Sequence, residues 1–79
     1  MTALDRAHAR AQLRIRLRAY LEALERSTTG RGPQIKRRRR ELRRLAAVAG
    51  EAPQLELVLA VVHEADDRRR TEAGHRLLA

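Results

Sequence analysis

Two short segments rich in glycine and proline divide the chain into three stretches of helical character. The first reads TTGRGP at residues 28–33, and the second reads GEAP at residues 50–53. In each segment a glycine stands where helices commonly end in a left-handed residue, and a proline stands where the next helix would begin. The intervening stretches lack strand-like alternation and contain few β-branched residues. The pattern therefore predicts helices over about 3–28, over 33–49, and over 53–70 or 53–78.

The core of this chain has to be built almost without aromatic side chains. The 79 residues include no Phe or Trp and a single tyrosine, Tyr20. Leu, Ile, Val and Ala must then fill the interior, which favours close packing of helix against helix. We expect a single all-α domain over residues 1–79, a small three-helix bundle. A break near residues 71–74 would turn the C-terminal end into a short fourth helix.

Helical periodicity leaves more apolar surface than three helices of one chain bury. The first stretch carries two apolar stripes, and the third is apolar over a wide arc in which Leu57 and Val61 lie outside the main stripe. Such a surplus is typical of association, and a core this small gains stability from it. We therefore expect a homo-oligomer, most simply a dimer, or a protein partner. The predicted core or oligomer contacts are Leu13, Leu17, Tyr20, Leu24, Leu57 and Val61.

The basic residues are concentrated in the middle of the chain. The net charge is +8, and residues 30–50 contain eight basic side chains and one acidic side chain. On a helical wheel Arg38 falls inside the apolar stripe of the second predicted helix, and Arg39 falls at its edge. The outward face consists of Lys36, Arg37, Arg40, Arg43 and Arg44. Arg31, in the loop before this helix, adds a further charge.

Three interpretations of this basic face remain open: contact with the phosphates of DNA or RNA, docking on an acidic protein, and a solvated helix face. Five charges along about two helical turns match the charge density of a nucleic-acid backbone. Such contacts give salt-dependent affinity with little sequence preference. Arginine makes up 17 of the 18 basic residues, and alanine is abundant. This composition indicates a GC-rich genome, bacterial or phage, so the choice of arginine over lysine is not in itself a sign of phosphate chemistry.

We expect a small nucleic-acid-binding protein, such as a regulator or accessory factor of a bacterial, plasmid or phage nucleoprotein complex. The alternative is a non-enzymatic helical adaptor or structural subunit whose basic face docks on an acidic protein. A helix-turn-helix is disfavoured, because the third helix would be the reading helix and begins with the apolar stretch PQLELVLAVV.

Other classes of function find little support in the sequence. The chain has no cysteine, and its hydroxyl residues stand mostly at expected helix ends, so we predict no enzymatic activity. His63 and Asp67 have i, i+4 spacing, but a metal site needs three or four ligands, and we expect a surface pair. We predict no metal, no cofactor and no small-molecule substrate. The longest apolar run, residues 57–62, is too short to span a membrane, so we expect a cytoplasmic protein.

Overall fold

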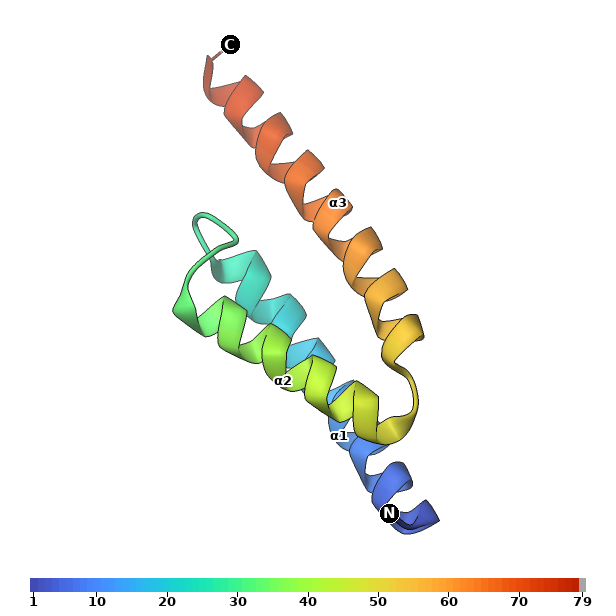
Figure 1. The fold of residues 1–79 in the computed structure, drawn as a ribbon. Coiled ribbons are helices and arrows are strands. Elements are labelled where there is room, and N and C mark those ends of the chain that lie inside the picture. Colours follow the sequence, from blue (N-terminus) through green and yellow to red (C-terminus); the bar gives the residue numbers. More distant parts are fainter. Residues whose placement is uncertain (79) are drawn as a thin grey trace.

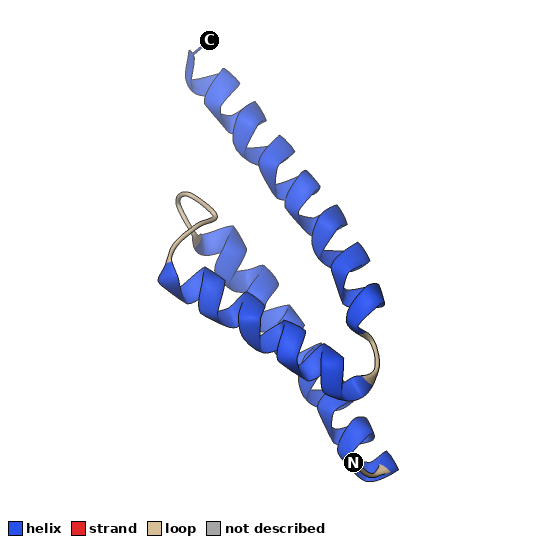
Figure 2. Cartoon of the chain, viewed as in Figure 1, coloured by secondary structure: helices blue, strands red, loops and turns tan. Residues whose placement is uncertain are grey.

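The structure, a computed structural model, describes the backbone of residues 1–78 and the side chains of residues 1–76, and it consists of three α-helices. They are α1 (Ala3–Arg26), α2 (Pro33–Ala49) and α3 (Ala52–Leu78), and Figure 2 shows the short connections between them. Residues 1–78 contain no strand. The prediction of an all-α fold with three helices is confirmed.

Local sequence signals explain where most of these helices begin and end. Thr2 caps α1, because its hydroxyl accepts a hydrogen bond from the Asp5 amide at 3.2 Å, and the Asp5 carboxylate accepts one from the Thr2 amide at 2.9 Å. Pro33 occupies the first turn of α2. Gly50 ends that helix in a left-handed conformation with φ of 73°, which confirms its predicted role.

One helix end differs from the expectation, and another decides between the two predicted lengths of the third helix. α1 stops at Arg26, and Ser27 is extended, so Gly30 lies in the following loop and does not terminate the helix. α3 continues through Gly74 as one helix, so the described residues form no fourth helix. A glycine within a helix costs only about 1 kcal/mol relative to alanine, which is too little to interrupt a long helix.

The core lies where α3 folds back over the hairpin of α1 and α2 (Figure 1). α1 packs extensively on α2, and α3 packs on α2 over a shorter length, whereas the backbones of α1 and α3 lie farther apart and are joined through side chains. The molecule is elongated, with extents of 56 × 21 × 15 Å. The buried cluster consists of Leu13, Tyr20, Leu24, Ile35, Leu42, Ala46, Leu55 and Leu59.

The predicted core or oligomer contacts divide between the interior and the surface. Leu13, Tyr20 and Leu24 are buried, and Leu17 is half-buried against the core. Leu57 and Val61 of α3 are 70% and 69% exposed. They take no part in the core of one chain, and their place in an oligomer contact stays a prediction.

Candidate nucleic-acid interface

The structure divides the predicted basic face into a part without acidic partners and a part with them. Arg31, Lys36, Arg37 and Arg40 are exposed. Within residues 1–78, none of these four side chains lies within ion-pair distance of an acidic group. They occupy the loop before α2 and the first two turns of that helix.

Acidic residues neutralise the C-terminal part of the face. Arg43 Nε lies 2.7 Å from Glu56 Oε1, and Arg43 Nη2 donates to Glu56 Oε2 at 3.3 Å. This hydrogen bonding lowers the pKa of Glu56 and raises the pKa of Arg43. Arg44 lies 3.3 Å from Glu41, a carboxylate that it shares with Arg16 of α1. The ion pair with Glu56 exists because α3 packs along the flank of α2 that carries Arg43.

The same flank accounts for the positions of Arg38 and Arg39, which the helical wheel placed inside the apolar stripe and at its edge. Arg38 was expected to point toward the apolar stripe, but it is exposed. Arg39 is the residue that reaches inward: it is half-buried, and its Nε donates to the Tyr20 hydroxyl at 3.3 Å. Periodicity identifies one apolar stripe, but it cannot show on which side of that stripe a third helix will pack.

Tyr20 and His63 form a polar bridge between α1 and α3. Tyr20 Oη and His63 Nε2 are 2.8 Å apart. Because Arg39 Nε–H already donates to this hydroxyl, we assign the hydroxyl proton to a hydrogen bond with neutral His63. The ring nitrogen of His63 therefore bonds to Tyr20, and the expected His63–Asp67 surface pair is not formed. Tyr20 is fully buried, so it offers no platform on which a base could stack.

This bridge predicts a pH dependence of stability. Burial, and then the charge of Arg39, lowers the pKa of His63 below its ordinary value of 6.5; Arg43 acts in the same direction, and Asp67 and Asp66 oppose it. As the pH falls below about 6.5, the unfolded chain takes up a proton that the folded chain still excludes. The free energy of unfolding should therefore decrease from pH 6.5 down to the native pKa of His63. Urea denaturation at pH 7.5 and at a series of values down to 5 measures this decrease.

Two variants assign the pH effect to one histidine. His63→Gln should lose the decrease, whereas His8→Gln, at an exposed position on α1, should keep it. The lowered pKa values of Asp5, Glu56 and Asp66 affect stability only at more acidic pH, below the ordinary values of these carboxyl groups. An unchanged pH profile in His63→Gln would contradict the assignment.

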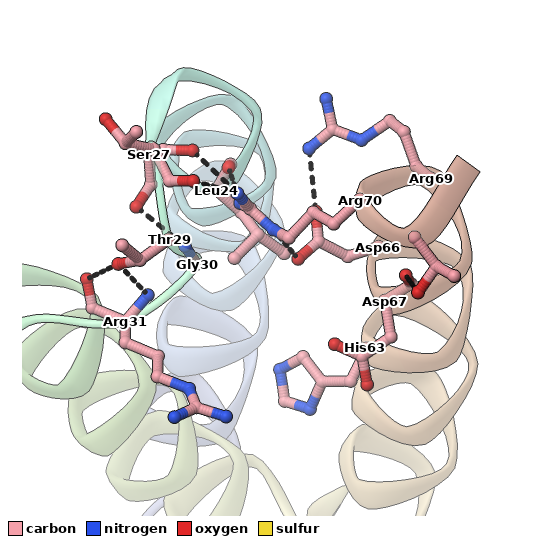
Figure 3. Close-up of polar contacts among 12 residues, drawn as sticks. Leu24, Ser27, Thr29, Gly30, Arg31, His63, Asp66, Asp67, Arg69 and Arg70 are labelled. Atoms are coloured by element: carbon pink, nitrogen blue, oxygen red, sulfur yellow. Dashed lines mark hydrogen bonds and ion pairs between the residues drawn. The ribbon is translucent and has the colours of Figure 1, made fainter. Parts of the chain in front are cut away.

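A second polar bridge joins α3 to the end of α1, as Figure 3 shows. Arg70 donates to the carbonyl oxygens of Leu24, Ser27 and Thr28 at 3.0, 3.0 and 2.7 Å, and its Nε donates to Asp66 at 2.7 Å. Burial opposes ionisation of Asp66, but the hydrogen bonds from Arg70 and Arg69 outweigh it, and the pKa of Asp66 is lowered. Arg70 thus binds the carbonyls of Ser27 and Thr28, just after α1, and adds a second hydrogen bond to the Leu24 carbonyl, which also accepts from the Ser27 amide at 3.3 Å.

The sequence does not indicate this capping role, because Arg70 and the carbonyls that it contacts are more than 40 positions apart. Within the sequence, Arg70 is one of three consecutive arginines after two aspartates, and its spacing from Asp66 suggests only an i, i+4 pair on one helix. The carbonyl contacts require α3 to lie beside the end of α1.

Gly30 should tolerate alanine less well than Gly50 does. Both have a left-handed φ, of 70° and 73°, so alanine at either position costs about 1 kcal/mol in backbone strain. At Gly30 the added Cβ would also lie 3.0 Å from Arg70 Nε and from Asp66 Oδ2, whereas at Gly50 it meets nothing within 4 Å. We expect Gly30→Ala to lower the free energy of unfolding by about 2–3 kcal/mol and Gly50→Ala by about 1 kcal/mol, as measured in urea. Equal losses would show that Arg70 moves aside without losing its hydrogen bonds.

The position of the free cations opposes the helix dipole. The N-terminal end of a helix carries partial positive charge, and cations are unfavourable there by some 0.3–1 kcal/mol each. Lys36 nevertheless stands in the first turn of α2, with Arg37 and Arg38 just beyond it, and this turn has no acidic residue and no capping side chain from Gly32. These charges do not stabilise the helix that carries them.

Neither comparison with known proteins nor side-chain clustering supplies a different site. No protein-family model, curated protein or solved structure matches the chain. Within the part of the chain that the structure describes, no three His, Asp or Glu side chains are grouped to hold a metal ion. None of its helices combines the length and apolar composition needed to cross a membrane. The cations of α2 that have no acidic partner are therefore the residues to which a function is best assigned.

Proposed function

We propose that this chain is a non-enzymatic protein that binds the phosphate backbone of a structured nucleic acid through the loop before α2 and the first two turns of that helix. The contacting side chains are Arg31, Lys36, Arg37, Arg38 and Arg40. Arg43 and Arg44, which are engaged by Glu56 and Glu41, contribute less than the sequence alone indicated.

The observation that carries this proposal is the run of cations at the positive end of α2. Lys36 opposes the helix dipole and is repelled by Arg40 at i, i+4 spacing, and acidic residues nearby pair with other arginines instead. Local features that oppose folding are expected at functional sites. The phosphates of a nucleic acid would supply the negative charges that the fold does not place beside these cations.

The composition of the surface favours phosphates over an acidic protein. Protein interfaces derive most of their affinity from buried aromatic or apolar anchors at their centre. Arg37 and Arg40 stand among other exposed cations, and the nearest large apolar residues of α2, Ile35 and Leu42, are buried in the core. Such a surface offers charge without an anchor, which is typical of backbone contact with nucleic acid.

Salt-dependent binding tests the proposal directly. A duplex of about 20 base pairs and random sequence is titrated with the full chain at several salt concentrations between about 50 and 200 mM. If each of the five cations neutralises one phosphate, the logarithm of the association constant should fall against the logarithm of salt with a slope of about −4.5. RNA and DNA duplexes are both measured. Absence of binding to either at the lowest salt would refute the proposal and leave the acidic-protein adaptor as the better hypothesis.

A further inference from the structure

A hollow between the loop before α2 and the middle of α3 brings cations and one free carboxylate together. Its volume is about 280 Å³. One wall carries Arg31, Lys36 and Arg39, and the opposite wall carries His63 and Asp67. Figure 3 shows Arg31 reaching toward this gap from the loop, with His63 and Asp67 entering it from α3.

The two aspartates that line the hollow differ in their partners. Asp66 is nearly buried and accepts hydrogen bonds from both Arg69 and Arg70 at 2.7 Å. The Asp67 side chain is exposed, and within residues 1–78 its carboxylate forms no hydrogen bond or ion pair. Asp67 is therefore a free hydrogen-bond acceptor beside a row of phosphate-binding cations.

A free carboxylate at this position distinguishes between two kinds of nucleic-acid backbone. It repels phosphate, and a deoxyribose offers no hydroxyl group beside the phosphate to compensate. A ribose carries a 2′-hydroxyl, which can donate to a carboxylate while the adjacent phosphate lies on the cations. The volume of the hollow is just under the roughly 300 Å³ at which pockets begin to hold drug-sized ligands. That is room for a single ribose-phosphate unit.

We infer that the hollow selects RNA over DNA: Arg31, Lys36 and Arg39 hold a backbone phosphate, and Asp67 accepts a hydrogen bond from a 2′-hydroxyl. The inference rests on the proposed function and names its substrate class. A-form RNA duplexes present their 2′-hydroxyls and phosphates together across the shallow minor groove, and recognition there needs no stacked bases. This agrees with the burial of Tyr20, the single aromatic residue of the sequence.

The test compares three duplexes of the same sequence: RNA, DNA, and 2′-O-methyl RNA, which keeps the A-form but lacks the hydroxyl donor. The full chain is titrated with each at one salt concentration. We expect RNA to bind about tenfold more tightly than DNA, the effect of one charge-assisted hydrogen bond at a partly exposed site. The 2′-O-methyl duplex should bind no more tightly than DNA.

Variants then assign the selectivity to one carboxylate. Asp67→Ala should weaken binding to RNA and strengthen binding to DNA, so that the two affinities converge. Glu72→Ala removes the same charge from an exposed position of α3 outside the hollow, and it should keep the preference for RNA.

Each outcome separates this inference from the proposal that precedes it. Equal binding of RNA and DNA by the unmodified chain overturns the selectivity and leaves backbone binding intact. A 2′-O-methyl duplex that binds as well as RNA shows that helix shape is recognised and overturns the role of Asp67. A preference for RNA that persists in Asp67→Ala also overturns the role of Asp67. Failure to bind any duplex at low salt refutes the proposed function together with the inference.

Discussion

Replacing Arg37 and Arg40 together by glutamate should weaken nucleic-acid binding by about a hundredfold or more at low salt, which is about 2.7 kcal/mol or more. The change removes two exposed cations from the face that lacks acidic partners and places two repelling charges there. It should change the stability of α2 little: a glutamate in place of Arg37 would lie four residues from Glu41 and be repelled by it, whereas a glutamate in place of Arg40 would lie four residues from both Lys36 and Arg44 and be attracted by them. Electrophoretic mobility shift and thermal denaturation measure the two effects.

A matched variant separates local contact from net charge. Arg6→Glu with Arg76→Glu changes two exposed arginines near the ends of the chain. Both double variants lower the net charge from +8 by four, to +4. We expect the variant at the ends to lose much less affinity than the variant in α2. Equal losses would mean that the total charge, and not the face of α2, attracts the nucleic acid.

Leu42→Ala should remove a large part of the total stability. Leu42 is fully buried in the cluster to which all three helices contribute. Truncating a leucine at such a site costs about 2–5 kcal/mol through lost burial and the cavity that remains. A chain of 79 residues is expected to have a free energy of unfolding of about 4–12 kcal/mol, so this loss ranges from about a sixth of the total to all of it. Urea denaturation followed by circular dichroism measures it.

Leu4→Ala is the control, because it makes the same chemical change where the side chain is 78% exposed. Its effect should stay within about 0.5 kcal/mol. A loss at Leu4 comparable to that at Leu42 would show that the N-terminal part of α1 is covered by a second copy of the chain or by another partner. A small loss at Leu42 would contradict the described core.

The helices were largely predictable because their signals are local. Pro33 and Gly50 mark ends through their own backbone preferences, and the apolar stripe of α2 follows from a period of 3.6 residues. The end of α1 was less predictable. Gly30 suggests a helix end nearby, yet the backbone leaves the helix at Ser27. There Arg70 of α3 donates hydrogen bonds to the carbonyls of Leu24 and Ser27.

The candidate interface was only partly predictable for a related reason. The sequence indicates that Arg37 and Arg40 face away from the apolar stripe, and both are exposed. It does not indicate that Glu56 neutralises Arg43, or that Arg39 reaches the hydroxyl of Tyr20. Both contacts depend on which flank of α2 receives α3, and a helical wheel treats the two flanks as equivalent.

Chain order and periodicity therefore account for three helices and for a strongly basic second helix, since these properties arise from residues within a few positions of one another. The packing of α3 accounts for the features of the candidate site that the sequence does not indicate. It determines which cations keep their charge free for a ligand, and it brings Asp67 to the hollow that Arg31 and Lys36 line. Such contacts join residues 13 or more positions apart, so no local pattern in the sequence records them.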